Sequence, residues 1–216
     1  MRLYGLLGLG SFLLSWGLGV LSVPTCLIGA TYGIYWPTIV LITYYFYRSV
    51  YPLKRWKQVK GKDGWFTLNA NPYCKSQRIV FDEGASAPAP ASKSMISIVP
   101  HGILTVGFIF CATSEEFDNS EVKWLVTDML LQLPFVRDFM VWVDAWEVNK
   151  QRMTEFLSKG ENVALIPGGF QEATLYLRNR HRVFIKNRKG FIKYALKYGY
   201  GVIPIYCFGE ERLVLS

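Results

Sequence analysis

Hydrophobic residues fill the first fifth of the chain in two long runs. Residues 3–23 and residues 27–47 contain no charged side chain. Each run has roughly the ~20 residues that a helix needs to cross the hydrocarbon core of a bilayer. Only residues 24–26 separate the two runs. We therefore predict a tight transmembrane hairpin over residues 1–47, with both of its ends on one side of the membrane.

Two other interpretations of these runs are open. The first run, preceded by Arg2, has some features of a signal peptide, but it is long for one and shows no clear cleavage site. Two helices buried in the core of a soluble protein would also be apolar. Pro37 falls inside the second run, and membrane helices tolerate such a proline better than soluble helices do. The hairpin remains our interpretation.

A basic segment follows the second run. Its positive side chains are Arg48, Lys54, Arg55, Lys57, Lys60 and Lys62. Positive charge beside a membrane span marks the cytoplasmic side and attracts anionic headgroups. We interpret the net charge of +8 as affinity for a membrane surface, and residues 48–94 as a linker and loop on that surface. Nucleic-acid binding is the alternative, but the chain has no nucleic-acid motif.

From residue 95 onward the pattern alternates between strands and helices. Short β-branched or aromatic runs predict strands, and apolar positions at helical spacing predict helices. The expected strands are 96–99, 122–126, 139–143, 162–166 and 202–208, and the expected helices are 102–111, 149–158 and 188–198. Such alternation is typical of a layered α/β domain. We expect this domain to occupy residues 95–216 and to be incomplete at its C-terminal end.

The candidate chemistry begins with His101, one of two histidines. It stands in "VPHG" between Pro100 and Gly102, at the end of a predicted strand. Ligands collect at the carboxyl ends of strands in α/β sheets, so a general base and a structural histidine are both open. The four cysteines have no metal-ligand or redox spacing. We expect neither a metal nor a cofactor.

A second glycine turn follows another buried strand. "IPGGFQEA" contains Pro167, Gly168 and Gly169 and leads to Glu172. A Pro-Gly-Gly sequence is by itself only a tight turn. Here it places an acid next to a strand end, so Glu172 and His101 could face one cleft.

Five segments in order now resemble one known family. They are "VPHGIL", "PFVRD", "IPGGFQEA", "RKGFIKYAL" and "VIPIYCFGE". Together they are similar to the type-two diacylglycerol acyltransferase family, which includes monoacylglycerol and wax-alcohol acyltransferases. The resemblance covers the chain from Arg48 onward. Val99 stands where the family has a further histidine, at a position that bears on efficiency or substrate choice.

The resemblance implies transfer of a fatty acyl group from acyl-CoA to diacylglycerol or a similar lipid alcohol. It implies a location in the endoplasmic reticulum membrane with the catalytic domain in the cytosol, and at lipid droplets. His101 would be the catalytic base and Glu172 the acid that orients it or binds substrate. An aspartate five residues after the histidine, found in wider relatives, is replaced here by Val106. The oligomeric state, a homo-oligomer included, is left open.

Further candidate residues surround these two. Oxyanion-holding or substrate-binding roles fall to Pro100, Gly102, Pro167, Gly168, Gly169, Phe208, Gly209 and Glu210. A dense basic run could bind the phosphates of acyl-CoA, because arginine suits phosphate geometry, or it could face lipid headgroups. Its predicted contacts are Arg178, Arg180, Arg182, Arg188 and Lys189. A lysophospholipid acyltransferase and an inactive truncated homologue are the alternative functions.

Overall fold

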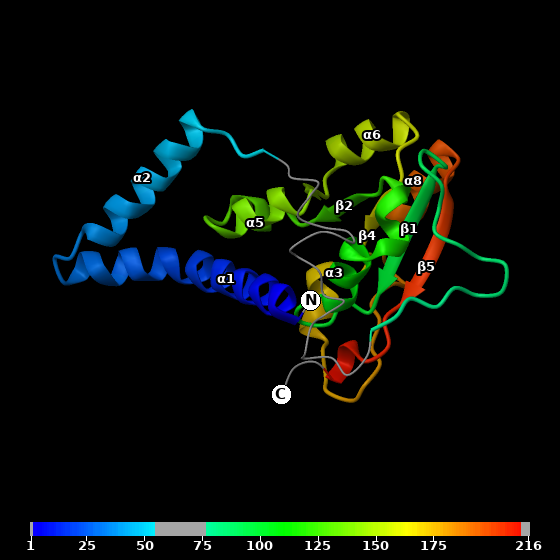
Figure 1. Cartoon of the computed structure of the whole chain (residues 1–216), viewed down its shortest axis with the longest axis horizontal. Coiled ribbons are helices and arrows are strands. Elements are labelled where there is room, and N and C mark those ends of the chain that lie inside the picture. Colours follow the sequence, from blue (N-terminus) through cyan, green and yellow to red (C-terminus); the bar gives the residue numbers. More distant parts are fainter. Residues whose placement is uncertain (1, 55–76, 213–216) are drawn as a thin grey trace.

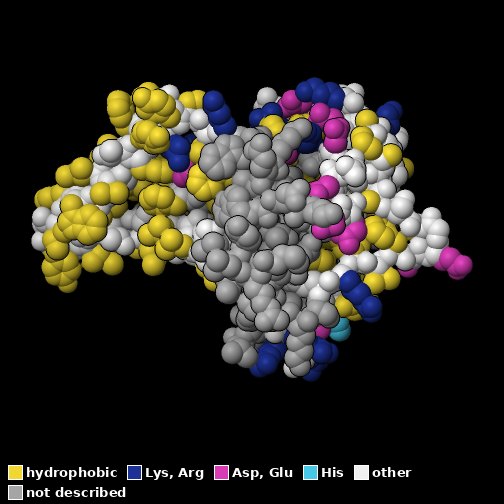
Figure 2. All heavy atoms as spheres, viewed as in Figure 1, with side chains coloured by type: hydrophobic (Ala, Val, Ile, Leu, Met, Phe, Trp, Pro, Cys, Tyr) yellow, Lys and Arg dark blue, Asp and Glu magenta, His cyan; other side chains and the backbone are white. Residues whose placement is uncertain are grey.

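The computed structural model describes residues 2–54 and 77–212, with side chains from residue 10 onward. The N-terminal part is a pair of helices, α1 (Arg2–Thr31) and α2 (Trp36–Val50). The second helix returns beside the first at an angle (Figure 1). Large apolar side chains cover the exposed faces of both helices, at the left of Figure 2.

The predicted position of the hairpin turn is wrong. Helix α1 continues through Pro24 to Thr31, and the chain turns over residues 32–35. Pro37 lies in the first turn of α2, where a missing N–H costs no helical hydrogen bond. Helix α2 has 15 residues, fewer than the predicted second span. In the described part of the chain, only 10–31 is long and apolar enough to cross a membrane.

The hairpin packs on two short helices, α4 (Asp128–Gln132) and α5 (Val136–Trp142). Phe12 of α1 is 5% exposed and lies against Phe139, with ring centroids 5.3 Å apart. Gly19 lies so close to Val136 and to the carbonyl of Pro134 that a Cβ atom would overlap both. The helical pair is therefore a packed part of the structure.

A buried carboxylate ties α2 to α5. Asp138 accepts a hydrogen bond of 2.7 Å from the hydroxyl of Tyr44 and pairs with the Arg48 guanidinium at 2.8 Å. The Tyr44 hydroxyl in turn accepts a hydrogen bond from the Phe135 N–H. Asp138 is 5% exposed, and a buried charge is tolerated when it is paired in this way. The aspartate of "PFVRD" therefore fixes the hairpin to the rest of the chain.

The remaining elements form a five-stranded sheet in which every pair is parallel. Its order is β3-β2-β4-β1-β5. The strands are β1 (Ser94–Val99), β2 (Lys123–Val126), β3 (Ala145–Glu147), β4 (Val163–Leu165) and β5 (Gly201–Tyr206). The predicted α/β class is confirmed. The start of the predicted domain, residue 95, is one residue inside β1.

Helices cover both faces of the sheet. Because side chains alternate along a strand, Met95 packs on one face and its neighbour Ile96 on the other. The first face is covered by α6 (Lys150–Ser158) and α8 (Gly190–Tyr198), and the second by α3 (Val106–Thr113) and the 3-10 turn η3 (Glu115–Ser120). Two short elements, α7 (Gly169–Thr174) and η4 (Glu210–Arg212), follow β4 and β5.

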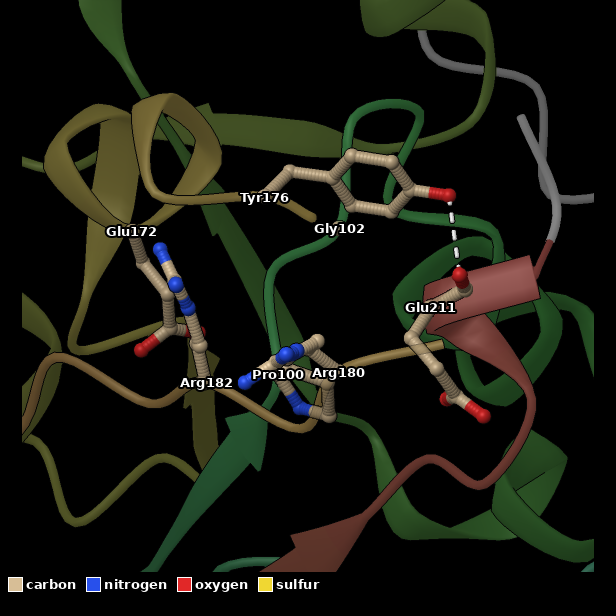
Figure 3. Close-up of a pocket in the computed structure, with 7 residues that line it drawn as sticks. All are labelled: Pro100, Gly102, Glu172, Tyr176, Arg180, Arg182 and Glu211. Carbon is tan, nitrogen blue, oxygen red and sulfur yellow. Dashed lines mark hydrogen bonds between the residues drawn. The ribbon is translucent and has the colours of Figure 1, made fainter. Parts of the chain in front are cut away.

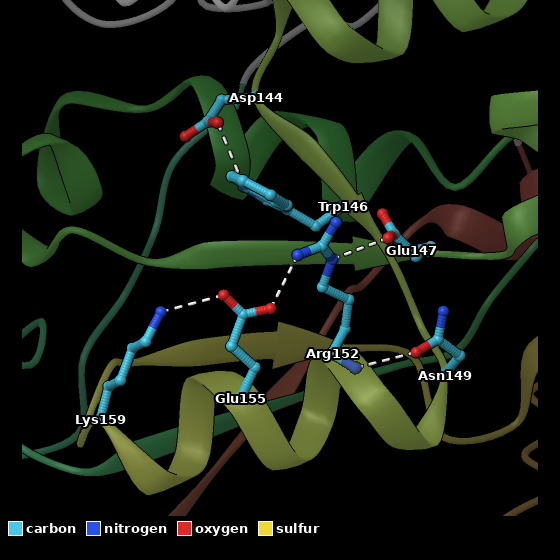
Figure 4. Close-up of polar contacts among 7 residues, drawn as sticks. All are labelled: Asp144, Trp146, Glu147, Asn149, Arg152, Glu155 and Lys159. Atoms are coloured by element: carbon cyan, nitrogen blue, oxygen red, sulfur yellow. Dashed lines mark hydrogen bonds and ion pairs between the residues drawn. The ribbon is translucent and has the colours of Figure 1, made fainter.

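The predicted helix at 149–158 is confirmed with its start signal. The Asn149 side chain accepts a hydrogen bond of 2.8 Å from the N–H of Arg152 and so caps α6 (Figure 4). Arg152 also bridges the carboxylates of Glu147 and Glu155. These contacts hold the connection between β3 and α6.

Two other predictions need correction. The predicted strand 139–143 lies mostly in helix α5, because Val136, Phe139 and Met140 share one helical face that is buried beside α1. The predicted helix 102–111 starts later, at Val106. Residues 55–76 of the predicted surface linker, including Arg55, Lys57, Lys60 and Lys62, lie outside the described residues.

Candidate active site

Three chemistry-bearing residues follow three neighbouring strands. His101 comes two residues after β1, Glu172 lies in α7 after β4, and Glu210 opens η4 after β5. Strand β1 lies between β4 and β5. In a parallel sheet the carboxyl ends of such strands share one edge, which is where α/β proteins bind ligands. The fold therefore gathers a histidine and two acids that lie far apart in the sequence.

The His101 side chain is half-buried and its orientation is set by the backbone. Its Nδ1 atom lies 2.8 Å from the carbonyl oxygen of Gly102. A carbonyl only accepts hydrogen bonds, so Nδ1 carries the proton and Nε2 of the neutral ring has the free lone pair. In this tautomer Nε2 can take a proton from a substrate.

Glu172 holds the main chain around the histidine. One of its carboxylate oxygens accepts a hydrogen bond of 2.5 Å from the N–H of His101, and the other accepts one of 2.5 Å from the N–H of Phe184. The side chain is 2% exposed. A Cβ atom on Gly168 would overlap this carboxylate. Glu172 thus joins the β1 turn to the loop before α8, and its contacts are with backbone rather than with the imidazole.

Glu210 supports the histidine turn from its other side. It accepts hydrogen bonds from the N–H groups of Val106, at 3.0 Å, and Gly107, at 2.8 Å, in the first turn of α3. Gly102 has a φ of +62°, and a Cβ atom there would overlap the Glu210 side chain. Burial raises the pKa of Glu210 to about 7, although the two N–H donors act in the opposite direction.

The role of Glu210 could not be read from the sequence. Its partners lie 103 and 104 residues away, so no local pattern reveals them. The one signal was the acid directly after a strand in "FGE". The neighbouring Phe208 is 86% exposed, and Gly209 has a φ of +91°, which only glycine adopts readily. Phe208 itself contacts Tyr206.

The structure narrows the choice of oxyanion donors. The N–H of Gly169 donates to the carbonyl of Ile166 in the turn, so it is engaged. Within the described residues, the N–H groups of Gly102 and Gly168 have no hydrogen-bond acceptor. Pro167 is half-buried between β4 and this turn. Gly102 and Gly168 remain the candidates among the predicted glycines.

A small cavity opens beside the histidine turn (Figure 3). Its lining consists of Pro100, Gly102, Glu172, Tyr176, Arg180, Arg182 and Glu211. The main-chain carbonyl of Glu211 accepts hydrogen bonds from the Tyr176 hydroxyl and the Asn179 N–H. The loop after α7 is thereby held over this edge of the sheet.

The predicted phosphate-binding run is divided between two places. Arg180 and Arg182 line the cavity with Glu172 and Glu211. Arg188 and Lys189 line a separate groove beside α8. Arg178 is exposed and lines neither.

No group of three or more histidine, cysteine, aspartate or glutamate side chains in the described chain is arranged to hold a metal ion. The donors around His101 are mainly backbone N–H groups that face carboxylates.

Taken together, a parallel sheet, a histidine turn held between two buried carboxylates and an apolar helical pair define an α/β protein with a candidate catalytic edge. A family model described as diacylglycerol acyltransferase matches residues 34–215. The chain therefore belongs to the diacylglycerol acyltransferase family.

Individual relatives agree with this assignment. The chain is 33% identical to diacylglycerol O-acyltransferase 2-like protein 6 of Mus musculus in an alignment of 133 residues that covers 57% of this chain and 40% of the relative. It is 31% identical to 2-acylglycerol O-acyltransferase 3 of Homo sapiens over 57% of this chain and 39% of the relative. It is 32% identical to diacylglycerol O-acyltransferase 2 of Dictyostelium discoideum over 57% of this chain and 40% of the relative.

The matched region spans about two-fifths of each of these relatives. No solved structure matches this chain.

Proposed function

We propose that this chain transfers a fatty acyl group from acyl-CoA to the hydroxyl of diacylglycerol, forming triacylglycerol. The observation that carries this proposal is the position of His101. Its Nδ1 atom faces the Gly102 carbonyl at 2.8 Å and leaves Nε2 free, at the edge of the sheet where ligands bind. Family membership supplies the reaction class.

The reaction needs a base but no metal-activated nucleophile. A thioester is already activated, whereas an alcohol is a poor nucleophile until its proton is removed. A positioned base contributes about 10²–10⁴-fold to such a step, and a neutral imidazole suits it near pH 7. His101 Nε2 is therefore the atom to which we assign the hydroxyl proton.

The proposed reaction forms a C–O bond and breaks the C–S bond of the thioester. The alcohol oxygen attacks the thioester carbonyl as its proton passes to Nε2, and an oxyanion forms on the carbonyl oxygen. The N–H groups of Gly102 and Gly168 are the proposed donors to this oxyanion, where loss of one donor costs about 10²–10³ in rate. When the C–S bond breaks, the proton on Nε2 goes to the departing CoA thiolate. The products are an ester and free CoA.

Glu172 and Glu210 act as positioning residues in this proposal. Their carboxylates accept hydrogen bonds from backbone N–H groups on both sides of the turn. The carbonyl of Gly102 supports the imidazole, and this chain has Val106 where wider relatives have an aspartate. Val99, where the family has a histidine, is half-buried at the end of β1 and remains the position to examine if turnover is low.

The apolar hairpin supports delivery of lipid substrates from a bilayer. Phe12 and Trp16 of α1 belong to the same cluster as Ile109 of α3, the helix that begins five residues after His101. A membrane helix would thus lie next to the site. The positive charge after α2 favours a cytosolic catalytic domain at the endoplasmic reticulum membrane, with lipid droplets as a second location.

The test is acyl transfer from labelled acyl-CoA in microsomes that contain the chain. Diacylglycerol, 2-monoacylglycerol, a long-chain alcohol and a lysophospholipid would be compared as acceptors. We expect labelled triacylglycerol from diacylglycerol. Transfer to the lysophospholipid alone would favour the alternative enzyme, and a chain that is inert with every acceptor would favour an inactive homologue.

A further inference from the structure

A groove of about 430 Å³ lies beside the start of α8, apart from the cavity at the histidine turn. Four of its lining side chains are cationic, namely Lys186, Arg188, Lys189 and Lys193. None of the four forms an ion pair with any residue that the structure describes. The groove therefore concentrates positive charge that no described carboxylate neutralises. We call it the cationic groove.

The rest of the lining is apolar. It is formed by Ile185, Phe191 and Ile192, and Ile192 is 38% exposed. A basic surface that only contacts solvent does not require a groove with apolar walls. Cationic and apolar groups that line one hollow suit a ligand with both a phosphate and an apolar part.

Arg188 shows how the groove is attached to the rest of the site. Its guanidinium donates to the Gln171 side chain at 2.5 Å and lies 5.4 Å from the centre of the Phe184 ring. Its Nε atom is buried and lacks a hydrogen-bond partner among the described residues. The arginine is thus held in place with one buried donor unused.

A short path of contacts links this groove to His101. The N–H of Phe184, the residue whose ring contacts Arg188, donates to one oxygen of Glu172. The other oxygen of the same carboxylate accepts the N–H of His101. A ligand that orders the segment 184–188 would therefore also support the carboxylate that holds the catalytic turn.

We propose that the cationic groove binds a phosphate ester. The identity of this ester rests on the proposed function: if the chain is an acyltransferase, the groove binds a phosphate of acyl-CoA. The alternative ligand with the same chemistry is the phosphate of an anionic lipid headgroup. Charge-assisted contacts from lysine and arginine are strong ligands for phosphate oxygens. The basic run then has two tasks, with Arg180 and Arg182 facing acids at the cavity and the groove residues facing phosphate.

The test uses the full chain in detergent and a pair of variants with equal loss of charge. Lys186→Ala with Lys193→Ala removes two groove cations. Lys150→Ala with Lys159→Ala removes two exposed lysines at the two ends of α6, outside the groove. Binding of CoA and of dephospho-CoA, which lacks the 3′-phosphate, is measured without any acyl acceptor. Flotation with phosphatidylcholine vesicles, with and without phosphatidic acid, is measured in parallel.

We expect the groove variant to bind CoA about tenfold more weakly, a change of about 1.4 kcal/mol, and to lose any preference for CoA over dephospho-CoA. The α6 variant should bind as the wild type does. A groove variant that instead loses only its binding to phosphatidic acid vesicles assigns the site to a lipid headgroup. A groove variant equal to the wild type in both assays overturns the proposal.

These readouts separate the groove from the proposed function. A chain that binds CoA through the groove but transfers no acyl group keeps the phosphate site and refutes the acyltransferase proposal. A chain that transfers acyl groups equally well in both variants, with unchanged Michaelis constants for acyl-CoA, keeps the function and excludes acyl-CoA as the phosphate ester that the groove binds.

Discussion

The carboxylate of Glu172 receives the backbone N–H of His101 at 2.5 Å, whereas the imidazole of His101 faces the carbonyl of Gly102. The acid and the histidine are thus coupled through the main chain. This differs from sites in which a carboxylate contacts the ring itself. Glu172 therefore fixes the shape of the turn. The tautomer of His101 is set by a backbone carbonyl, which a side-chain substitution cannot remove.

This coupling predicts the effect of Glu172→Gln. A glutamine has one acceptor oxygen for two N–H donors, so its NH₂ group would face the N–H of His101 or of Phe184. We expect a loss of about 1–3 kcal/mol in unfolding free energy from the unsatisfied buried group. The turnover number should fall more than the Michaelis constant for acyl-CoA rises, because the histidine loses its position.

The matched control for this change is Glu116→Gln, at an exposed position in η3. It should leave both stability and turnover close to wild type. Thermal unfolding in detergent and steady-state kinetics measure the two effects. Equal turnover in Glu172→Gln and the wild type would contradict a positioning role.

Glu210 predicts a pH dependence of stability. Burial raises its pKa from the ordinary value of 4.5 to about 7 in the folded chain, so folding favours the protonated carboxyl. The contribution of this group to stability is full below about pH 4.5 and is lost as the pH rises towards 7. Glu210→Gln cannot titrate and should lack this component.

The measurement is the unfolding free energy of both proteins in detergent between pH 4.5 and pH 8. The unfolding free energy of the wild type minus that of Glu210→Gln should decrease as the pH rises from about 4.5 to about 7, and it should level off above pH 7. Titration of other groups cancels in this difference. A difference that is constant, or that increases with pH, would show that burial of Glu210 does not raise its pKa.

Two glycines of α1 provide a test of hairpin packing. A Cβ atom on Gly19 would lie 2.6 Å from a Val136 methyl and 2.7 Å from the Pro134 carbonyl oxygen, whereas one on Gly17 would have no atom within 4 Å. Alanine improves helix propensity by about 1 kcal/mol at either position. At Gly19, overpacking should lower the unfolding free energy by about 1–3 kcal/mol, which opposes this gain.

We therefore expect Gly17→Ala to be neutral or stabilising and Gly19→Ala to be less stable than Gly17→Ala. Thermal unfolding in detergent measures the difference. Limited proteolysis at the hairpin should also be faster in Gly19→Ala. Indistinguishable variants would mean that α1 does not pack on α5 as described.

Local signals in the sequence were sufficient for much of the sheet domain. Strand β1, in which Met95 and Ile96 are both buried on opposite faces of the sheet, follows from a short apolar run bounded by polar residues, and the cap at Asn149 follows from its side chain and position. The strand ends that carry His101 and Glu172 were predictable for the same reason. The glycine turns marked where the chain leaves the sheet.

Features that depend on distant contacts were not predictable in this way. The run 139–143 fits a strand as well as a helix, and its packing against Phe12 of α1 decides between them. Helix α1 passes through Pro24, so residues 24–26, where the sequence predicted the hairpin turn, lie inside the helix. Glu210 meets Val106 and Gly107 only in the folded chain.

The most direct test of the central claim compares the two histidines. His101→Gln and His181→Gln would each be assayed for transfer of labelled acyl groups from acyl-CoA to diacylglycerol. His181 is 53% exposed in its side chain and contacts Tyr206 and Glu211, so it serves as the control. We predict that His101→Gln lowers turnover by about 10²–10⁴-fold while His181→Gln stays near wild type. Full activity in His101→Gln would contradict the assignment of His101 as the general base.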